Sequence, residues 1–331
     1  MNQRQPRSVF LGTGSAVPPT VVTNHDLEKI VETSDEWITT RTGIKERRVL
    51  DPDKATSDLA LEACHKALGD AGLEVGDIEA IIAGTCTPDY QFPSMACVLE
   101  GKLGARGVFS FDVNAACSGF LNALSIADSF IRTERVQKVL VVGSDVLSRF
   151  LNWEDRTTCI LFGDAAGAVV LGASDDPDRG ILGTRLQTDG SHAETLYVQA
   201  GGAKKPATHE TVDNNEHTIY MNGKEVFKLA VRSMEEISRR VLNEAGIAIE
   251  DLAYVVPHQA NRRIISALAT RLGVPMEKVA VNVNKYGNTS AASVPVALDE
   301  IIREGRVGPG DVILLNAFGA GFAWGASVIR L

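Results

Sequence analysis

Short apolar runs alternate along the chain with longer segments whose apolar residues recur at helical spacing. Val139–Val142 and Val312–Leu315 have the length and composition of buried strands. From residue 120 the apolar positions follow a helical period; they are Phe120, Leu121, Leu124, Ile126, Ala127, Phe130 and Ile131. Strands that alternate with helices in this way predict an α/β fold.

The pattern of residues 67–82 returns in residues 241–256. The identical pairs, all at one offset, are Leu68/Leu242, Ala71/Ala245, Gly72/Gly246 and Asp77/Asp251, and apolar positions match at Leu73/Ile247, Ile78/Leu252, Ile81/Val255 and Ile82/Val256. Each copy predicts a helix that ends at a glycine, a short loop and then a buried strand.

Further echoes follow in the same order. Residues 102–104 correspond to 271–273, the predicted strand Val108–Val113 to Val279–Val283, Val139–Val142 to Val312–Leu315, and Phe162-Gly163 to Phe318-Gly319. We therefore predict a duplicated α/β unit of roughly 150 residues per half, a usual domain size. The halves are residues 1–175 and 176–331, with a polar excursion over 184–220. The excursion contains His192, His209 and His217, whose spacing fits no metal motif.

Duplication has a consequence for the position of a site. If the halves pack about a pseudo-two-fold axis, equivalent strand ends meet at one place, and open α/β sheets bind ligands there. Cys117 and Asn288 would then occupy related helix starts, and His258 would follow the strand Ala253–Val256.

Composition and charge narrow the function classes. The chain has 331 residues, of which 44% are hydrophobic and 23% charged, with a net charge of -9. An acidic balance argues against non-specific nucleic-acid binding. The five cysteines show no CxxC pair and indicate neither a zinc site nor a redox pair, so we expect a reducing, cytoplasmic compartment. The chain has no signal-type N-terminus and no apolar run near the roughly 20 residues that span a bilayer, so we expect no membrane association.

Cys117 lies at the junction of a predicted strand and a predicted helix. Val108, Phe109, Phe111 and Val113 before it indicate a buried strand, and the helical apolar pattern begins at Phe120. A thiol in the first turn of a helix is close to unpaired N–H groups and to the positive end of the helix dipole, and both favour the nucleophilic thiolate. A small buried hydrophobe is the alternative role for such a cysteine.

Two polar residues of the second half could act with this cysteine. His258 comes directly after a buried strand, where a side chain is held rigidly, and Asn288 lies in a Gly-Asn-Thr-Ser segment. Asn288 could be a helix N-cap. It could also join a neutral His258 as a hydrogen-bond donor to a thioester enolate, and the turn at Ala317–Phe322 could supply backbone N–H groups to a second oxyanion. Neither a complete GxGxxG nor a Walker A pattern is present.

Together these segments resemble a known family. Asn114–Gly119, Pro257–Asn261, Gly287–Ser293 and Phe318–Phe322, with residues 33–38 and 41–44, resemble β-ketoacyl-acyl carrier protein synthase III over nearly the whole chain. That family initiates type II fatty acid synthesis. The resemblance implies a thiolase-like, five-layered αβαβα fold built from a duplicated unit with pseudo-two-fold symmetry.

The resemblance also implies a mechanism without a tightly bound cofactor or a metal. Cys117 would take an acyl group from acyl-CoA, with backbone N–H groups of Cys117 and Ala320 as the oxyanion hole. His258 and Asn288 would then stabilise the enolate formed from malonyl-acyl carrier protein as CO₂ leaves. The product would be a 3-oxoacyl-acyl carrier protein.

Binding residues follow from the same resemblance. Those expected to bind CoA are Trp37, Arg41, Arg156, Phe227, Ala260, Asn261 and Arg263; those expected at the acyl pocket are Phe92, supplied by the partner subunit of a homodimer, and Phe318; and those expected to dock the carrier protein are Lys228, Arg262, Arg263 and Arg271.

Alternatives remain open at this stage. A degradative thiolase needs a second catalytic cysteine near the C-terminus, and the last cysteine is Cys159. A hydroxymethylglutaryl-CoA or polyketide-type synthase would share the three residue types, so the segment with Trp37 and Arg41 is the main discriminator. A Cys-His-Asn protease fits the residue order but neither its usual cysteine signature nor the duplication. A non-catalytic CoA-binding module would bind acyl-CoA without a covalent adduct.

Overall fold

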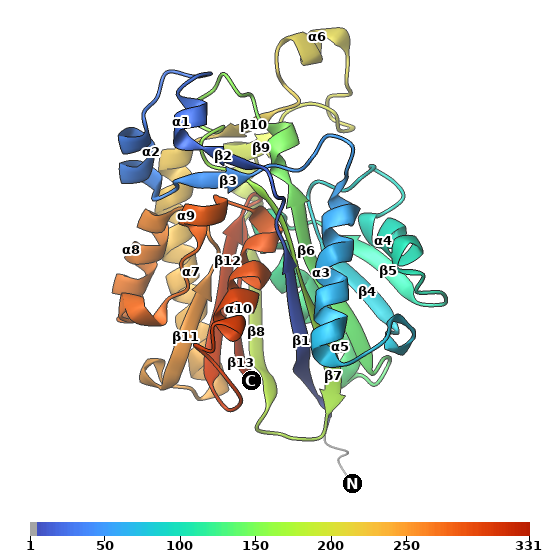
Figure 1. The fold of residues 1–331 in the computed structure, drawn as a ribbon. Helices are drawn as coiled ribbons and strands as arrows, with labels where there is room; N and C mark the ends of the chain where they lie inside the picture. Colours follow the sequence, from blue (N-terminus) through green and yellow to red (C-terminus); the bar gives the residue numbers. More distant parts are fainter. Residues whose placement is uncertain (1–4) are drawn as a thin grey trace.

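Two β-sheets with matching strand order form the frame of the molecule, for which a computed structural model describes residues 5–331 (Figure 1). The first sheet has the order β1-β7-β6-β4-β5, with β1 Arg7–Ala16, β7 Asp164–Ser174, β6 Lys138–Val146, β4 Ala80–Gly84 and β5 Phe109–Val113. The second has the order β8-β13-β12-β11, with β8 Gly180–Thr188, β13 Ala323–Arg330, β12 Val312–Gly319 and β11 Leu252–Pro257. Two small sheets pair β2 Val21–Thr23 with β3 Glu46–Arg48, and β9 Leu196–Val198 with β10 Ile219–Met221.

The pairing directions repeat as well. In the first sheet β4 is parallel to β6, while β7 is antiparallel to both β6 and β1. In the second, β11 is parallel to β12, while β13 is antiparallel to both β12 and β8. The duplicated α/β unit predicted from the sequence is therefore confirmed. Our division after residue 175 falls between β7 and β8.

Helices form three layers around the two sheets, which gives five layers in all. Helices α3 (Thr56–Ala71) and α4 (Met95–Leu103) pack on the first sheet, α7 (Gly223–Ala245) and α8 (Arg262–Leu272) on the second, and α5 (Gly119–Arg132) and α10 (Ser293–Arg303) contact strands of both. The shorter elements are α1 Asn24–Leu27, α2 Asp35–Thr42, α6 His209–Asp213, α9 Val283–Tyr286, and the 3₁₀ helices η1 Val75–Asp77, η2 Ala116–Ser118, η3 Leu147–Phe150, η4 Gly190–Thr195, η5 Ile249–Asp251, η6 Met276–Lys278 and η7 Ser290–Ala292.

The two glycines of the repeat, Gly72 and Gly246, end equivalent helices with the same pattern of hydrogen bonds. Gly72 after α3 and Gly246 after α7 adopt φ values of 64° and 68°, a left-handed conformation that glycine takes without strain. The next residue donates back five positions in both copies, from Leu73 to Leu68 at 3.0 Å and from Ile247 to Leu242 at 3.0 Å. These are Schellman-type helix ends, as the repeated sequence predicts.

One predicted strand is wrong. Of Val279–Val283, only Val279 forms a bridge, to Val255, and α9 begins at Val283. The amide oxygen of Gln259 accepts hydrogen bonds from the backbone N–H groups of Asn282 and Val283, at 2.9 and 3.2 Å. The side chain of Gln259 therefore accepts hydrogen bonds from N–H groups that, in a strand, would donate to the neighbouring strand.

Two other predictions need correction. Strand β5 is an edge strand, and its Phe109 is 43% exposed, so the strand is not buried within one chain. The polar excursion starts later than predicted, because residues 184–188 belong to β8 and pair with β13. Residues 189–221 form the excursion itself, with η4, β9, α6 and β10.

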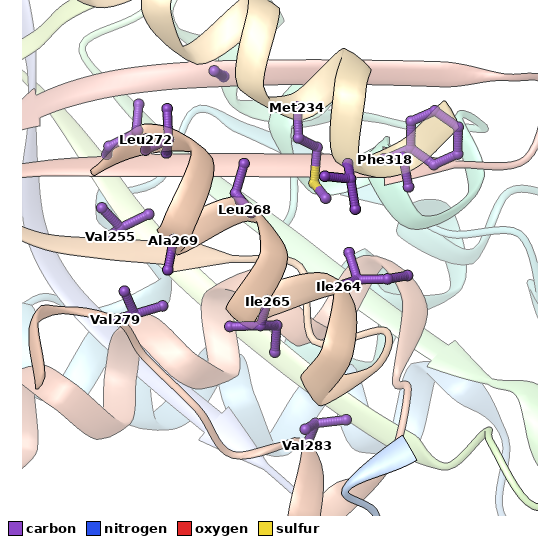
Figure 2. Packing of buried hydrophobic residues seen from close by; sticks show 14 of the residues in the cluster. Met234, Val255, Ile264, Ile265, Leu268, Ala269, Leu272, Val279, Val283 and Phe318 are labelled. Atoms are coloured by element: carbon purple, nitrogen blue, oxygen red, sulfur yellow. The ribbon is translucent and has the colours of Figure 1, made fainter. Parts of the chain in front are cut away.

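The outer layer of the second half illustrates how the apolar pattern is used. Ile265, Leu268 and Leu272 of α8 are buried with Val255 of β11 and Met234 of α7 in one apolar cluster (Figure 2). This packing fixes α8, and with it the segment that joins β11 to α8, where His258 lies. No helix in the described part of the chain is long and apolar enough to cross a bilayer.

Candidate active site

Cys117 lies between β5 and α5, in the 3₁₀ turn η2. The side chain is buried, with 8% exposure. Burial raises the pKa of Cys117 to about 12, and a hydrogen bond with Ser290 opposes that rise. The resting residue is therefore a thiol, and the thiolate expected from the helix start alone is wrong. The sequence indicated the nearby helix start, which lowers the pKa of a thiol, but not the burial of the sulfur, which raises it.

The second half provides a matching turn beside it. Helix α10 follows η7 as α5 follows η2, so Asn288 and Cys117 lie at related helix starts, as predicted. Ala116 and Ser290 have φ values of 45° and 50°, left-handed values that are uncommon for residues with a side chain. Two strained turns at equivalent positions, both next to the same sulfur, indicate a functional constraint on the backbone.

Asn288 is oriented by its own backbone surroundings. Its Oδ1 accepts a hydrogen bond from the N–H of Ser290 at 2.9 Å, and its own N–H donates to Leu161 at 2.8 Å. Because Oδ1 is engaged, the amide nitrogen is the group left to face a ligand. Asn288 thus presents two N–H donors, since an amide nitrogen has no acceptor capacity.

His258 follows the last residue of β11 and is 3% exposed. Its backbone N–H donates to Asn316 on β12 at 2.8 Å, which fixes the chain at this point. Burial lowers the pKa of His258 to about 3, so the imidazole is neutral near pH 7. A neutral imidazole was expected from the sequence.

A buried carboxylate ties the two halves together behind these residues. Oδ1 of Asp145 accepts from the N–H groups of Cys86 and Thr87 at 2.8 and 3.1 Å, and Oδ2 accepts from the N–H of Ala291 at 3.0 Å. Asp145 therefore joins the end of β4 to the turn η7. Ser290, the neighbour of Ala291, is fixed by the same contact.

The β12–β13 turn approaches Cys117 from the other side. A Cβ at Gly319 would lie 2.6 Å from the backbone nitrogen of Cys117, closer than real Cβ contacts, so only glycine fits there. Among the described residues, neither Cys117 nor Ala320 has a hydrogen-bond acceptor for its backbone N–H. Both predicted oxyanion donors are thus unpaired and close together in the fold.

Three cavities follow one another through this region. An outer cavity of 420 Å³ contains Trp37 and Arg263, and an inner one of 140 Å³ contains Cys117, His258 and Asn288. These two share Leu161, Gly223, Phe227 and Asn261. A third, of 400 Å³, shares Cys117, Phe162 and Leu196 with the inner cavity. The thiol therefore lies between a path to the surface and a separate pocket.

The outer cavity collects the residues expected to bind CoA. The guanidinium carbons of Arg41 and Arg156 lie 4.3 and 5.1 Å from the centre of the Trp37 ring, and that of Arg263 lies 5.6 Å from the Phe227 ring. Asn261 lines both the outer and the inner cavity, and Ala260 lines the inner one. Cations stacked on aromatic rings form a surface suited to a planar base with phosphates.

The residues expected at the acyl pocket are placed differently. Phe318 lines the inner cavity with His258, not the 400 Å³ pocket, because it packs on Phe322 and Trp324 at the end of β12. Phe92 is 86% exposed and lines none of the three cavities of its own chain.

The basic residues expected at a docking surface separate into two groups. Arg262 and Arg263 begin α8, and Lys228 lies near the start of α7. Arg271 is at the other end of α8, about 13 Å away at 1.5 Å per residue. It donates to Glu235 at 2.6 Å, so its charge is compensated and it does not extend the patch.

Several residues at the site were not identified from the sequence. Ser293 contacts His258, Cys86 lines the pocket beyond Cys117, and Lys224 lines the outer cavity. Lys224 and Lys228 have an i, i+4 spacing that could have suggested a shared helix face. Ser293 and Cys86 are far from their partners in sequence, and no local pattern identifies them. Among the described residues no cluster of histidine, cysteine or carboxylate groups could hold a metal ion.

Comparison with known proteins places this arrangement in a family. The family model described as 3-oxoacyl-[acyl-carrier-protein (ACP)] synthase III matches residues 111–190, and its C-terminal counterpart matches residues 242–331. Beta-ketoacyl-[acyl-carrier-protein] synthase III of Caldanaerobacter subterraneus subsp. tengcongensis is 53% identical over 321 residues, 97% of each chain. The chain belongs to the synthase III family.

Solved structures of synthase III proteins have the same fold. The 3-oxoacyl-[acyl-carrier-protein] synthase III of Aquifex aeolicus superposes with a TM-score of 0.91 at 50% identity, over 98% of this chain and 100% of its own. The priming β-ketosynthase of the R1128 polyketide pathway gives 0.91 at 35% identity, over 100% and 99%. The predicted thiolase-like fold is confirmed.

Synthase III enzymes are acyltransferases that initiate fatty acid synthesis by condensing acyl-CoA with malonyl-acyl carrier protein, and this chain is a condensing enzyme of that family. The family is generally free of cofactors. The protease and the non-catalytic binding module, both open from the residues alone, are set aside by this membership.

Proposed function

We propose that this chain forms an acyl-enzyme on Cys117 and uses His258 and Asn288 to condense it with malonyl-acyl carrier protein. The observation that carries the proposal is the convergence of the three side chains on one inner cavity, open through a second cavity that contains Trp37 and its two arginines.

The first step is the transfer of the primer. The sulfur of Cys117 attacks the thioester carbonyl of acyl-CoA, the carbonyl oxygen lies against the N–H groups of Cys117 and Ala320, and CoA leaves with the thiol proton. Unpaired backbone donors of this kind need no reorganisation as negative charge develops. Because the resting thiol is protonated, loading has to include the loss of that proton.

The second step makes a carbon nucleophile without a strong base. The bond between the malonyl carboxylate and its neighbouring carbon breaks, CO₂ leaves, and the electron pair enters the thioester as an enolate. His258 and Asn288 donate hydrogen bonds to the enolate oxygen. The carbon then attacks the acyl group on Cys117, the thiolate of Cys117 is the leaving group, and it takes up a proton from solvent to return to the resting thiol. A neutral histidine suits this role, since it donates without giving up its proton.

The expected CoA and pantetheine contacts follow the cavities. Trp37 and Arg156 bind the adenine by stacking, Arg41 and Arg263 bind phosphates, and the pantetheine arm passes Phe227, Ala260 and Asn261. The continuity of the outer and inner cavities supports this path.

The primer occupies the 400 Å³ pocket beyond Cys117. Its lining is mostly apolar, and its volume is more than twice that of the roughly 150 Å³ cavity that holds a benzene molecule. We expect primers larger than acetyl, such as branched or medium-chain acyl groups, to load, up to the depth that Phe92 of the partner subunit leaves open. A panel of acyl-CoAs that loads acetyl alone would contradict this expectation.

The functional unit is a homodimer. Edge strand β5 presents Phe109, and the loop after β4 presents Phe92, both to solvent in a single chain. Two β5 edges can pair as one continuous sheet, and an isologous contact of this kind is common. Phe92 of one subunit would then reach the primer pocket of its partner.

Malonyl-acyl carrier protein docks beside the outer cavity. Lys224 and Lys228 of α7 and Arg262 and Arg263 of α8 form a basic rim suited to an acidic carrier. Arg263→Glu should raise KM for the malonyl carrier protein, while Arg271→Glu, on the compensated residue, should change it little. Equal kinetics in both variants would exclude this docking surface.

The compartment we propose is the cytoplasm. All five cysteines, each within the described residues, are free. Free thiols, including the nucleophile, are retained in a reducing environment.

The half-reactions test the proposal directly. Cys117→Ala should abolish acyl loading, whereas His258→Ala and Asn288→Ala should load and then fail to decarboxylate the malonyl thioester. Normal condensation in His258→Ala would exclude the assigned roles. Normal loading in Cys117→Ala would exclude the nucleophile.

A further inference from the structure

Ser293 contacts the imidazole of His258 at Nδ1. Oγ of Ser293 and Nδ1 of His258 are 2.5 Å apart, across the boundary between α10 and the segment after β11. Ser293 is 1% exposed and His258 3%. Ser293 is the first residue of α10, so the helix that follows the Asn288 turn also carries the partner of His258.

The direction of this hydrogen bond follows from the other partners of the two groups. Among the described residues, Oγ of Ser293 has no hydrogen-bond partner except Nδ1 of His258. If Nδ1 carried the proton, the serine hydrogen would be buried without an acceptor, which is unfavourable. If the hydroxyl donates to Nδ1, both groups are satisfied. A neutral imidazole with Nδ1 as acceptor carries its proton on Nε2.

We propose that Ser293 is a positioning residue of the condensation step: its hydroxyl donates to Nδ1 of His258 and holds the tautomer in which Nε2–H faces the inner cavity. The orienting partner of a histidine generally determines which ring nitrogen is protonated. The amide of Asn288 is held in the corresponding way, with Oδ1 engaged and its N–H groups left for a ligand. Both side chains are therefore fixed as donors by a hydrogen bond from a neighbouring group to their acceptor atom.

This assignment separates the two half-reactions and rests on the proposed function. A histidine protonated at Nε2 has no acceptor facing Cys117, so it does not take the thiol proton during loading; that proton leaves with CoA. During condensation the Nε2–H stabilises the enolate without transferring its proton. Loss of Ser293 should therefore affect condensation and leave acyl loading unchanged.

Kinetics of three proteins test the role: the full-length wild type, Ser293→Ala and Ser293→Thr, the last of which keeps the hydroxyl. We expect Ser293→Ala to load acyl-CoA at the wild-type rate and to lose up to about 100-fold in kcat for condensation, the lower range for loss of one oxyanion donor. KM for the malonyl thioester should change little, and Ser293→Thr should retain most of the rate. Condensation at the wild-type rate in Ser293→Ala would overturn the proposal.

A spectroscopic measurement tests the tautomer without substrate. In ¹⁵N-histidine-labelled wild-type protein, the His258 signal, assigned by its absence in His258→Gln, should show a protonated Nε2 and an unprotonated Nδ1. A protonated Nδ1 would overturn the proposal even if the Ser293 variants fold poorly. If the wild type forms no acyl-enzyme, the proposed function fails instead, and this spectrum still decides the tautomer.

Discussion

Cys117 and His258 are buried side chains on the same cavity, and burial moves their pKa values in opposite directions. Both are therefore neutral at rest, with a thiol on one and an uncharged imidazole on the other. No thiolate–imidazolium pair precedes the reaction, in contrast with cysteine enzymes whose thiolate is formed by a histidine base. Neutral groups suit an enzyme that generates its carbanion by decarboxylation.

Residue motifs identified these side chains from the sequence, but not their ionisation. The helix start at Cys117 pointed to a thiolate, and burial reverses that expectation. Ser293, 35 residues from His258 in sequence, could not be recognised as its partner, because the contact arises only when α10 packs beside β11. Local pattern predicts which residue types react, while tertiary packing determines their protonation.

The lowered pKa of His258 should appear in the stability of the protein. The native pKa is about 3 and the ordinary value 6.5, so between these values the unfolded chain binds a proton that the native state does not. Stability from this group is full above about pH 6.5 and decreases as the pH falls. Relative to His258→Gln, which does not titrate, the wild type should lose about 2 kcal/mol of unfolding free energy from about pH 7.5 to about pH 5.

Urea unfolding of both proteins at the two pH values measures this difference. An unfolding free-energy difference that does not change with pH would show that His258 titrates normally in the native state. A wild type that gains stability relative to His258→Gln as the pH falls would show that the native state instead favours the protonated imidazole.

At the scale of secondary-structure elements, the repeated helix ends and strands were predicted correctly, whereas Val279–Val283 was wrongly predicted to be a strand. The apolar pattern there is that of a strand, but the amide of Gln259 takes the N–H groups of Asn282 and Val283. A pattern of apolar residues reports burial, whereas a strand also needs a neighbouring backbone to bond. Phe318 was expected at the acyl pocket from the family resemblance, but it packs on Phe322 and Trp324 and lines the inner cavity instead.

The closeness of the β12–β13 turn to Cys117 gives a prediction for Gly319. Gly319→Ala would place a Cβ 2.6 Å from the nitrogen of Cys117, so the turn has to move and Ala320 with it. We expect acyl loading to fall by about 100-fold or more, the effect of losing an oxyanion donor. Single-turnover loading followed by mass spectrometry measures the rate.

Gly101→Ala in α4 is the matched control, because a Cβ there meets nothing within 4 Å. It should load at the wild-type rate and gain slightly in stability, as alanine favours helices over glycine by about 1 kcal/mol. Wild-type loading in Gly319→Ala would exclude Ala320 as an oxyanion donor.

At the scale of the whole molecule, the two halves are joined through buried polar contacts as well as apolar packing. Asp299 of α10 accepts hydrogen bonds from Thr13 at 2.7 Å and Ser15 at 2.6 Å, both on β1. Asp145 makes the equivalent connection near the site, from β6 to η7. The duplication, inferred from the repeated sequence segments, predicted how the halves are arranged. The polar residues that join them are not part of those repeated segments, so they could not be predicted in this way.

Assembly provides a prediction at the same scale. The double variant Phe92→Asp, Phe109→Asp should lower the dimer fraction strongly, because it places charges on the exposed β5 edge and the adjoining loop. Val212→Asp, at an exposed apolar position of α6 in the excursion, is the control and should remain dimeric. Sedimentation velocity measures both. A wild-type chain that is monomeric at micromolar concentration would contradict the proposed homodimer.

The nucleophile is tested most directly by intact-protein mass spectrometry after mixing with a panel of acyl-CoAs, followed by peptide mapping. We predict a mass gain of one acyl group, located on the peptide that contains Cys117 and absent from Cys117→Ala. An adduct that persists in Cys117→Ala, for example on Cys86 in the neighbouring pocket wall, or no adduct with any acyl-CoA, would show that Cys117 is not the nucleophile.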